Sequence, residues 1–137
     1  MIKSRLLLLA ERLEKIEALP KPKRKREFDL GAWVRVGGEC GTAACAVGEA
    51  TFIQRFRDLG LRYSKRARGP TFKGSYDWEA VQRFFGIHYE QAVQLFTARG
   101  YSQITGQENC YGAKVRDVIT PGVVARKIRG FVETGAF

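Results

Sequence analysis

The segment from residue 40 to residue 50 constrains the fold most, because it reads C-G-T-A-A-C-A-V-G-E-A and an apolar run follows it as far as Gly60. Thr42 can act as an N-cap, since its hydroxyl can accept a hydrogen bond from a first-turn N–H. No proline interrupts the run, so the backbone can continue as one helix. The pattern therefore predicts a central helix over residues 43–59.

Small side chains recur at a spacing of four on this predicted helix. Ala44, Gly48 and Phe52 share one i, i+4 row, and the first two have little or no side chain. We therefore expect a second element to approach the helix backbone closely on this face.

Three more helices are predicted by apolar periodicity and by residues that begin or end a helix. Apolar residues at spacings of three and four predict a helix over residues 2–19, which Pro20 ends. Asp77 is expected to cap a helix that Gly86 breaks, and a further helix is expected over residues 89–98.

The last helix and a small hairpin complete the predicted elements. Thr120 and Pro121 occupy the favoured N-cap and first positions of a C-terminal helix. Residues 61–64 alternate like a short strand, residues 65–69 form a basic turn, and residues 70–72 would be the returning strand.

A chain of 137 residues is long enough to bury a core of its own. We expect a mainly α fold of the α+β class, with about five helices around the central helix and one small β-hairpin. Residues 1–27 would form an N-terminal amphipathic helix and basic linker, and residues 28–137 a single globular domain. The apolar run at residues 6–10 is too short to span a membrane, so no membrane partner is expected.

Positive charge gathers in two segments of the chain. There are 24 Lys and Arg residues against 14 Asp and Glu, which gives a net charge of +10. Residues 1–27 carry +5 and residues 55–73 carry +6, whereas the rest of the chain sums to −1. Such a field favours nucleic acid, an anionic membrane surface or an acidic protein partner.

Ten cations in these segments are the predicted nucleic-acid-binding residues, five in the linker and five on the hairpin. They are Lys21, Lys23, Arg24, Lys25, Arg26, Arg62, Lys65, Arg66, Arg68 and Lys73. On the hairpin the cations would neutralise phosphates while Tyr63 and Phe72 stack on bases. The alternatives are a solvated linker, and a solvated loop whose aromatic rings point inward.

Cysteine chemistry offers a second class of function. Cys40 precedes the predicted helix N-terminus, which would lower its thiol pKa, and with His88 as base it could form a hydrolase or transferase site. The other use of these groups is a zinc site, with ligands Cys40, Cys45, Cys110 and His88. One histidine and irregular spacing argue against both sites, so we expect no cofactor and favour a non-enzymatic protein. The simpler alternative is that Cys40 and Cys45 are small buried residues packed under Trp33.

Three cysteines are an odd number without the density of a secreted disulfide scaffold, which favours a reduced, cytoplasmic protein.

Two further patterns in the sequence are compatible with binding to nucleic acid. Residues 77–98 could be a helix-turn-helix with Gln91, Gln94 and Arg99 facing a groove, or an ordinary helical hairpin. Residues 37–42 have the general form of an anion-binding turn but lack the lysine that a P-loop needs.

Two motifs carry a resemblance to a family of small, uncharacterised bacterial and phage proteins. The first is F-D-x-x-x-W, here Phe28, Asp29 and Trp33, and the second is C-G-T-x-A-C-x-x-G-x-A at residues 40–50. The family has no established activity, so the resemblance implies no catalytic residue. A small basic protein of phage type implies host takeover, or inhibition of a nucleic-acid-handling defence complex.

We therefore expect a non-enzymatic module that binds nucleic acid or a nucleoprotein complex through its two basic segments. The alternatives are a Cys40-dependent hydrolase or transferase, and a protein-only inhibitor that docks into an acidic groove.

Overall fold

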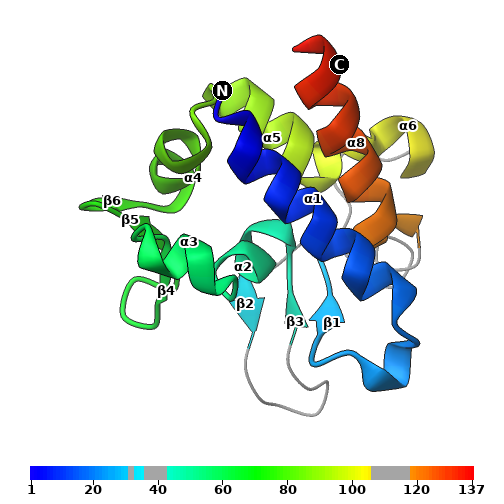
Figure 1. Cartoon of the computed structure of the whole chain (residues 1–137), viewed down its shortest axis with the longest axis horizontal. Helices are drawn as coiled ribbons and strands as arrows, with labels where there is room; N and C mark the ends of the chain where they lie inside the picture. The colour runs from blue at the N-terminus through cyan, green and yellow to red at the C-terminus, as the bar shows by residue number, and fades with distance from the viewer. Residues whose placement is uncertain (31–32, 36–42, 106–117) are drawn as a thin grey trace.

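The computed structural model of this chain describes residues 1–30, 33–35, 43–105 and 118–137 (Figure 1). The fold is mainly helical with two small β-sheets, which confirms the predicted class. The helices are α1 (Lys3–Ala18), α2 (Ala46–Ala50), α3 (Gln54–Asp58), α4 (Asp77–Phe85), α5 (Tyr89–Phe96), α6 (Ser102–Thr105) and α8 (Pro121–Thr134), with 3-10 turns η1 (Lys21–Lys23) and η2 (Ala98–Tyr101). The strands are β1 (Glu27–Phe28), β2 (Val34–Arg35), β3 (Ala43–Ala44), β4 (Arg62–Ser64), β5 (Gly69–Phe72) and β6 (Ser75–Tyr76).

Helices α1 and α8 lie side by side and antiparallel, and they form the largest helical contact (Figure 1). Their buried faces follow the expected spacings of three and four, with Leu6, Leu9, Leu13, Val124, Ile128 and Phe131 inside. The Thr120 hydroxyl accepts a hydrogen bond from the Val123 N–H at 3.3 Å, which confirms the predicted start of α8. The N-terminal helix therefore shares its core with the end of the chain.

The first residues of the chain are tied to the end of α4. The Ile2 N–H donates to the carbonyl oxygen of Phe85 at 2.8 Å, and Nη1 of Arg5 donates to that of Phe84 at 2.7 Å. Carbonyls in the last turn of a helix have no partner within the helix, so α1 supplies what α4 lacks. Gly86 ends α4 in the left-handed conformation at φ 66°, as its position predicts.

Phenylalanine rings fill the centre of the molecule, where α3, α4 and α5 meet. The ring centroids of Phe56 and Phe84 are 4.8 Å apart, and those of Phe84 and Phe85 are 5.0 Å apart, both in edge geometry. Phe96 from α5 lies 5.6 Å from Phe85. Edge contacts of this kind add to the burial of four large rings, so this cluster is the core on which the surface elements rest.

The predicted continuous helix over residues 43–59 is wrong. Its first two residues form strand β3, α2 begins after Cys45, and extended backbone at Ile53 separates α2 from α3. The β3 backbone hydrogen-bonds to two other strands, so it cannot also close helical turns. Thr42, the expected N-cap, lies outside the described residues.

A three-stranded sheet in the order β1-β3-β2 replaces the start of that helix, and the sequence did not predict it. Phe28 is opposite Ala44 in a parallel pair, and Val34 is opposite the same alanine in an antiparallel pair. Strands of two residues are too short to show alternation, so only pairing between distant segments reveals them.

The predicted hairpin is present and is one strand larger than expected. Strands β4 and β5 are antiparallel, with Arg62 opposite Thr71 and Ser64 opposite Gly69. Strand β6 adds to the other edge of β5, which places Tyr76 opposite Thr71. Asp77 was expected to cap α4, but the N-cap residue is Tyr76 and it makes no side-chain capping bond.

Over the ranges that the structure describes, no helix combines the length and the apolar character needed to cross a membrane.

Candidate nucleic-acid interface

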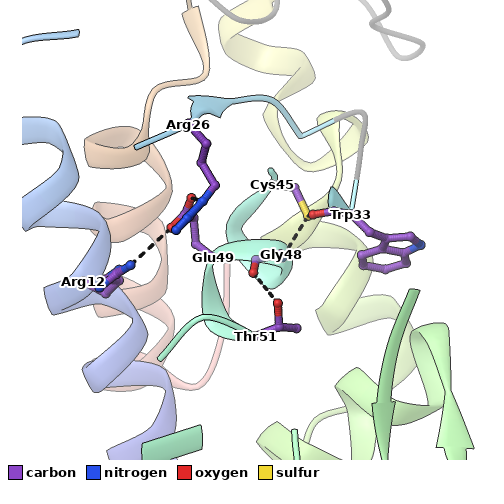
Figure 2. Close-up of polar contacts among 7 residues, drawn as sticks. All are labelled: Arg12, Arg26, Trp33, Cys45, Gly48, Glu49 and Thr51. Atoms are coloured by element: carbon purple, nitrogen blue, oxygen red, sulfur yellow. Dashed lines mark hydrogen bonds and ion pairs between the residues drawn. The ribbon is translucent and has the colours of Figure 1, made fainter. Parts of the chain in front are cut away.

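Among the described residues of the two sequence motifs, Trp33 of the first lies against Cys45 and Gly48 of the second (Figure 2). The Cys45 sulfur accepts a hydrogen bond from the Gly48 N–H at 3.3 Å and lies 3.8 Å from the carbonyl oxygen of Trp33, to which it can donate. A Cβ added at Gly48 would lie 1.7 Å from that same oxygen. The expected close approach of another element is therefore confirmed, and the Trp33 backbone is the element that approaches.

Cys45 has a structural environment rather than a reactive one. It is 2 % exposed, and burial raises the pKa of its thiol to about 12. A thiol with such a pKa is almost wholly protonated at neutral pH, so it neither attacks substrates nor binds metal readily. Its sulfur instead caps α2.

The other members of the cysteine and zinc sets are placed as follows. His88 is exposed and is the N-cap of α5, where its backbone N–H donates to Oε1 of Gln91 at 2.9 Å. Cys40 and Cys110 lie outside the described residues. Among the described residues, His, Cys, Asp and Glu form no group of three that could hold a metal ion. The hydrolase and zinc hypotheses stay predictions.

The linker cations are divided between internal contacts and solvent. Arg26 lies with its Nε 3.2 Å from Oε2 of Glu49, and its guanidinium stacks 3.7 Å from the ring centroid of Phe52. Arg12 from α1 lies 3.6 Å from the other Glu49 oxygen, so one buried carboxylate receives two guanidinium groups (Figure 2). Arg24 donates to the carbonyl oxygen of Leu19 at 3.0 Å. These contacts hold the linker against α2 and the end of α1.

Burial raises the pKa of Glu49, and the neighbouring Arg26 and Arg12 oppose that rise. Burial also lowers the pKa of Arg26, which Glu49 opposes.

A pocket of about 190 Å³ opens beside this ion pair between α1 and the linker. Its cationic lining consists of Arg12, Lys15, Lys23, Arg24, Lys25 and Arg26. Of the five linker cations, the three lysines are exposed to solvent: Lys21, Lys23 and Lys25.

The hairpin cations differ from Arg24 and Arg26, because all five are exposed. They are Arg62, Lys65, Arg66, Arg68 and Lys73. The Lys73 side chain lies with its Nζ 5.3 Å from the ring centroid of Phe72. Within the described parts of the chain, the other four form no ion pair. Unpaired surface cations are the groups that phosphates can contact without first breaking a salt bridge.

The solvent face of the β4–β5–β6 sheet carries a cation on one outer strand and an aromatic ring on the other. Opposite residues in antiparallel strands point to the same face, so Arg62, Thr71 and Tyr76 form one row across the three strands. Tyr76 is 56 % exposed and Arg62 is also exposed. The opposite face contains Pro70 and Phe72, both buried. We call the row of Arg62, Thr71 and Tyr76 the sheet face.

Three aromatic rings from separate elements contact one another in a row that reaches β5 through Trp33. The ring centroids of Trp33 and Trp78 are 4.6 Å apart, and Tyr89 lies 6.3 Å from Trp78 in edge geometry. We call Trp33, Trp78 and Tyr89 the aromatic row. A Cβ added at Gly69 would lie 3.6 Å from the Trp33 ring, so this ring contacts β5 on the side that the sheet face occupies.

The structure changes which aromatic side chains can contact a ligand. Phe72, expected to stack on bases, is 5 % exposed and packs in edge geometry against Phe84 at 5.2 Å. Trp33 packs against the core but is only partly buried. Tyr76 and the partners of Trp33 were missed, because no local pattern shows that residues 33, 69, 78 and 89 meet.

The predicted helix-turn-helix corresponds to α4 and α5 in the structure. Helices α4 and α5 do contact each other, as in any helical hairpin. Gln91 uses its side chain at the N-cap of α5, whereas Arg99 is exposed. Base reading by this unit stays a prediction.

Comparison with family models, with curated proteins and with solved structures found no match to this chain.

Proposed function

We propose that this protein is a non-enzymatic binding module that engages nucleic acid, free or within a nucleoprotein complex, through its β4–β5 hairpin. One observation carries the proposal: Arg62, Lys65, Arg66 and Arg68 are exposed and form no ion pair within the described residues. The net charge of +10 adds long-range attraction for a polyanion.

The hairpin is a better candidate than the linker because of what each segment's cations contact. Arg24 and Arg26 already contact Glu17 and Glu49, so a phosphate would have to compete with a carboxylate for them. The cations of the turn, Lys65, Arg66 and Arg68, have no such competitor among the described residues. The exposed linker lysines would add weaker, sequence-independent attraction.

The test is a salt series of binding to generic DNA and RNA with the full chain and the variant Lys65→Gln/Arg66→Gln/Arg68→Gln. Each lost phosphate contact lowers the log–log salt slope by about 0.7 to 0.9, so we expect the slope to fall by about 2 to 3. The matched control is Lys3→Gln/Arg55→Gln/Arg126→Gln, which removes the same charge from exposed positions on α1, α3 and α8.

An equal loss in both triple variants would mean that net charge alone attracts the ligand, and would contradict the hairpin assignment. No binding at low salt would contradict the nucleic-acid proposal as a whole. An acidic protein would then be the partner that binds these cations, and its capture should survive nuclease treatment.

The resemblance to small phage-type proteins suggests one kind of nucleoprotein target, a nucleic-acid-handling defence complex of the host.

A further inference from the structure

The sheet face and the aromatic row together suggest which kind of nucleic acid the protein binds. We propose that the ligand is single-stranded, with bases stacked on Tyr76 and on the aromatic row while its phosphates contact Arg62 and the basic turn. The inference rests on the proposed function and adds the class of ligand to it.

The first step of the argument is the alternation of chemistry on the sheet face. Arg62 on β4 and Tyr76 on β6 are separated by one residue, Thr71 on β5. Neighbouring strands are about 4.8 Å apart, so the two side chains leave the sheet about 10 Å apart. Long cationic and aromatic side chains at that separation can contact the phosphate and the base of neighbouring nucleotides in an extended strand.

The second step is the exposure of rings that a folded protein would normally bury. Tyr76 is 56 % exposed and Tyr89 is 53 % exposed. Tyr76 precedes Trp78 by two positions in the chain, and the Tyr89 ring packs against the Trp78 ring. Within the described residues, Tyr76 has no ring partner. Exposed rings beside cations bind unpaired bases, because every base has a face that can stack.

The third step concerns an acidic group beside Trp33 and β5, the Asp77 carboxylate. The Asp77 carboxylate lies against Gly69, where an added Cβ would be 2.0 Å from its Oδ1 and 3.6 Å from Trp33. A carboxylate repels phosphate, so it disfavours the backbone of the ligand near Trp33 and leaves that ring to a base. The phosphates are then directed to Arg62 and to Arg68, which is bonded to Gly69.

These three features favour a single strand over a duplex. A duplex keeps its bases stacked inside, so the rings would have no base face to contact. It also presents two phosphate backbones, which the Asp77 carboxylate would repel. A single strand presents base faces and one backbone, and so can use both the rings and the cations.

The chain provides its own probe for the test. It contains two tryptophans, and both belong to the aromatic row. A base that stacks on this row should quench the tryptophan emission, so the fluorescence reports contact at the site itself. The experiment titrates the full chain with a short oligothymidine and with a duplex of equal length at the same salt concentration.

We expect the oligothymidine to quench the emission and to bind more tightly than the duplex. Tyr76→Ala should weaken single-strand binding by about tenfold, Tyr76→Phe should restore it, and the salt slope should not change because no phosphate contact is lost. Phe137→Ala removes an exposed ring at the far end of α8 and serves as the matched control, with no expected effect.

Equal affinity for the duplex without quenching would overturn this inference. If Tyr76→Ala binds normally while the triple variant of the basic turn loses affinity, stacking fails and the proposed function stands. If neither nucleic acid binds at low salt, the proposed function itself fails. Tyr76 is exposed, so its variants are expected to fold, and a circular dichroism melt checks this.

Discussion

Arg26 lies with its Nε 3.2 Å from Oε2 of Glu49, and this ion pair joins the basic linker to α2 across 23 positions of sequence. Glu49 is 3 % exposed, and Arg12 approaches its second oxygen from α1. Three elements thus meet at one carboxylate. The pair explains why a linker that looks solvated in sequence is held on the folded domain.

Removing that carboxylate should destabilise the protein. Glu49→Gln leaves the Arg26 guanidinium partly buried without its counter-ion, so we expect a loss of about 3 kcal/mol in the free energy of unfolding by urea. The control is Glu14→Gln, whose carboxylate is exposed and whose loss should cost under about 1 kcal/mol. Equal effects of the two substitutions would mean that Glu49 has no special role.

Alanine at two glycines should have opposite effects. Gly48→Ala would place a Cβ 1.7 Å from the Trp33 carbonyl oxygen, so the motif must deform, at a cost of about 1–3 kcal/mol. Gly130→Ala meets no atom within 4 Å and lies inside α8, where alanine favours the helix by about 0.5–1 kcal/mol. Thermal melts of both variants would check the signs, and a stable Gly48→Ala protein would contradict the close approach.

Cys45 should resist alkylation in the folded protein. With a pKa of about 12, about one thiol in ten thousand is ionised at pH 8, and the sulfur is buried. Peptide mass spectrometry after iodoacetamide treatment should find Cys45 unmodified in buffer and modified in urea. Fast labelling in buffer would contradict its capping role. The same spectra report on Cys40, so they also test the hydrolase hypothesis.

The pair of Glu14 and Arg129 should make stability depend on acid pH. Nε and Nη2 of Arg129 donate to the Glu14 carboxylate at 2.8 and 2.7 Å, and these hydrogen bonds lower the pKa of Glu14. Its folded-state pKa is thus below the unfolded value of about 4.3. The pair therefore contributes stability above that pH and loses it as the pH falls through the folded-state pKa.

Arg129→Gln should remove this contribution, so wild type and variant should converge in stability as the pH falls below the folded-state pKa. The groups are exposed, and the difference at pH 7 should accordingly be small. An NMR titration of the Glu14 carboxyl in both proteins checks the direction. An unchanged titration in Arg129→Gln would show that the ion pair does not form in solution.

Local signals predicted most of the helices. Thr120 and Pro121 define the start of α8, and Gly86 defines the end of α4, because these residues act on the backbone within one turn of themselves. The same reasoning failed at residues 43–59, where helix-compatible residues pair as strand β3 with segments eight or more positions away. Pairing energy there outweighed local propensity.

The candidate site was predictable only in part. The hairpin, its turn and its five cations follow from alternation and charge in one short segment. The choice of aromatic residues did not follow, because which face of a strand of two to four residues points inward depends on what covers it. Phe72 turned inward onto Phe84, whereas Tyr76 was left on the sheet face.

The charge of the two basic segments, the helix ends and the hairpin turn could be predicted from the sequence, since each depends on residues close together in the chain. Which cations are neutralised and which rings are exposed to solvent depends on how distant segments pack together. Arg26 meets Glu49, and Trp33 meets Gly69, through contacts between distant segments. Burial and ion pairing depend on such contacts, and no local pattern encodes them.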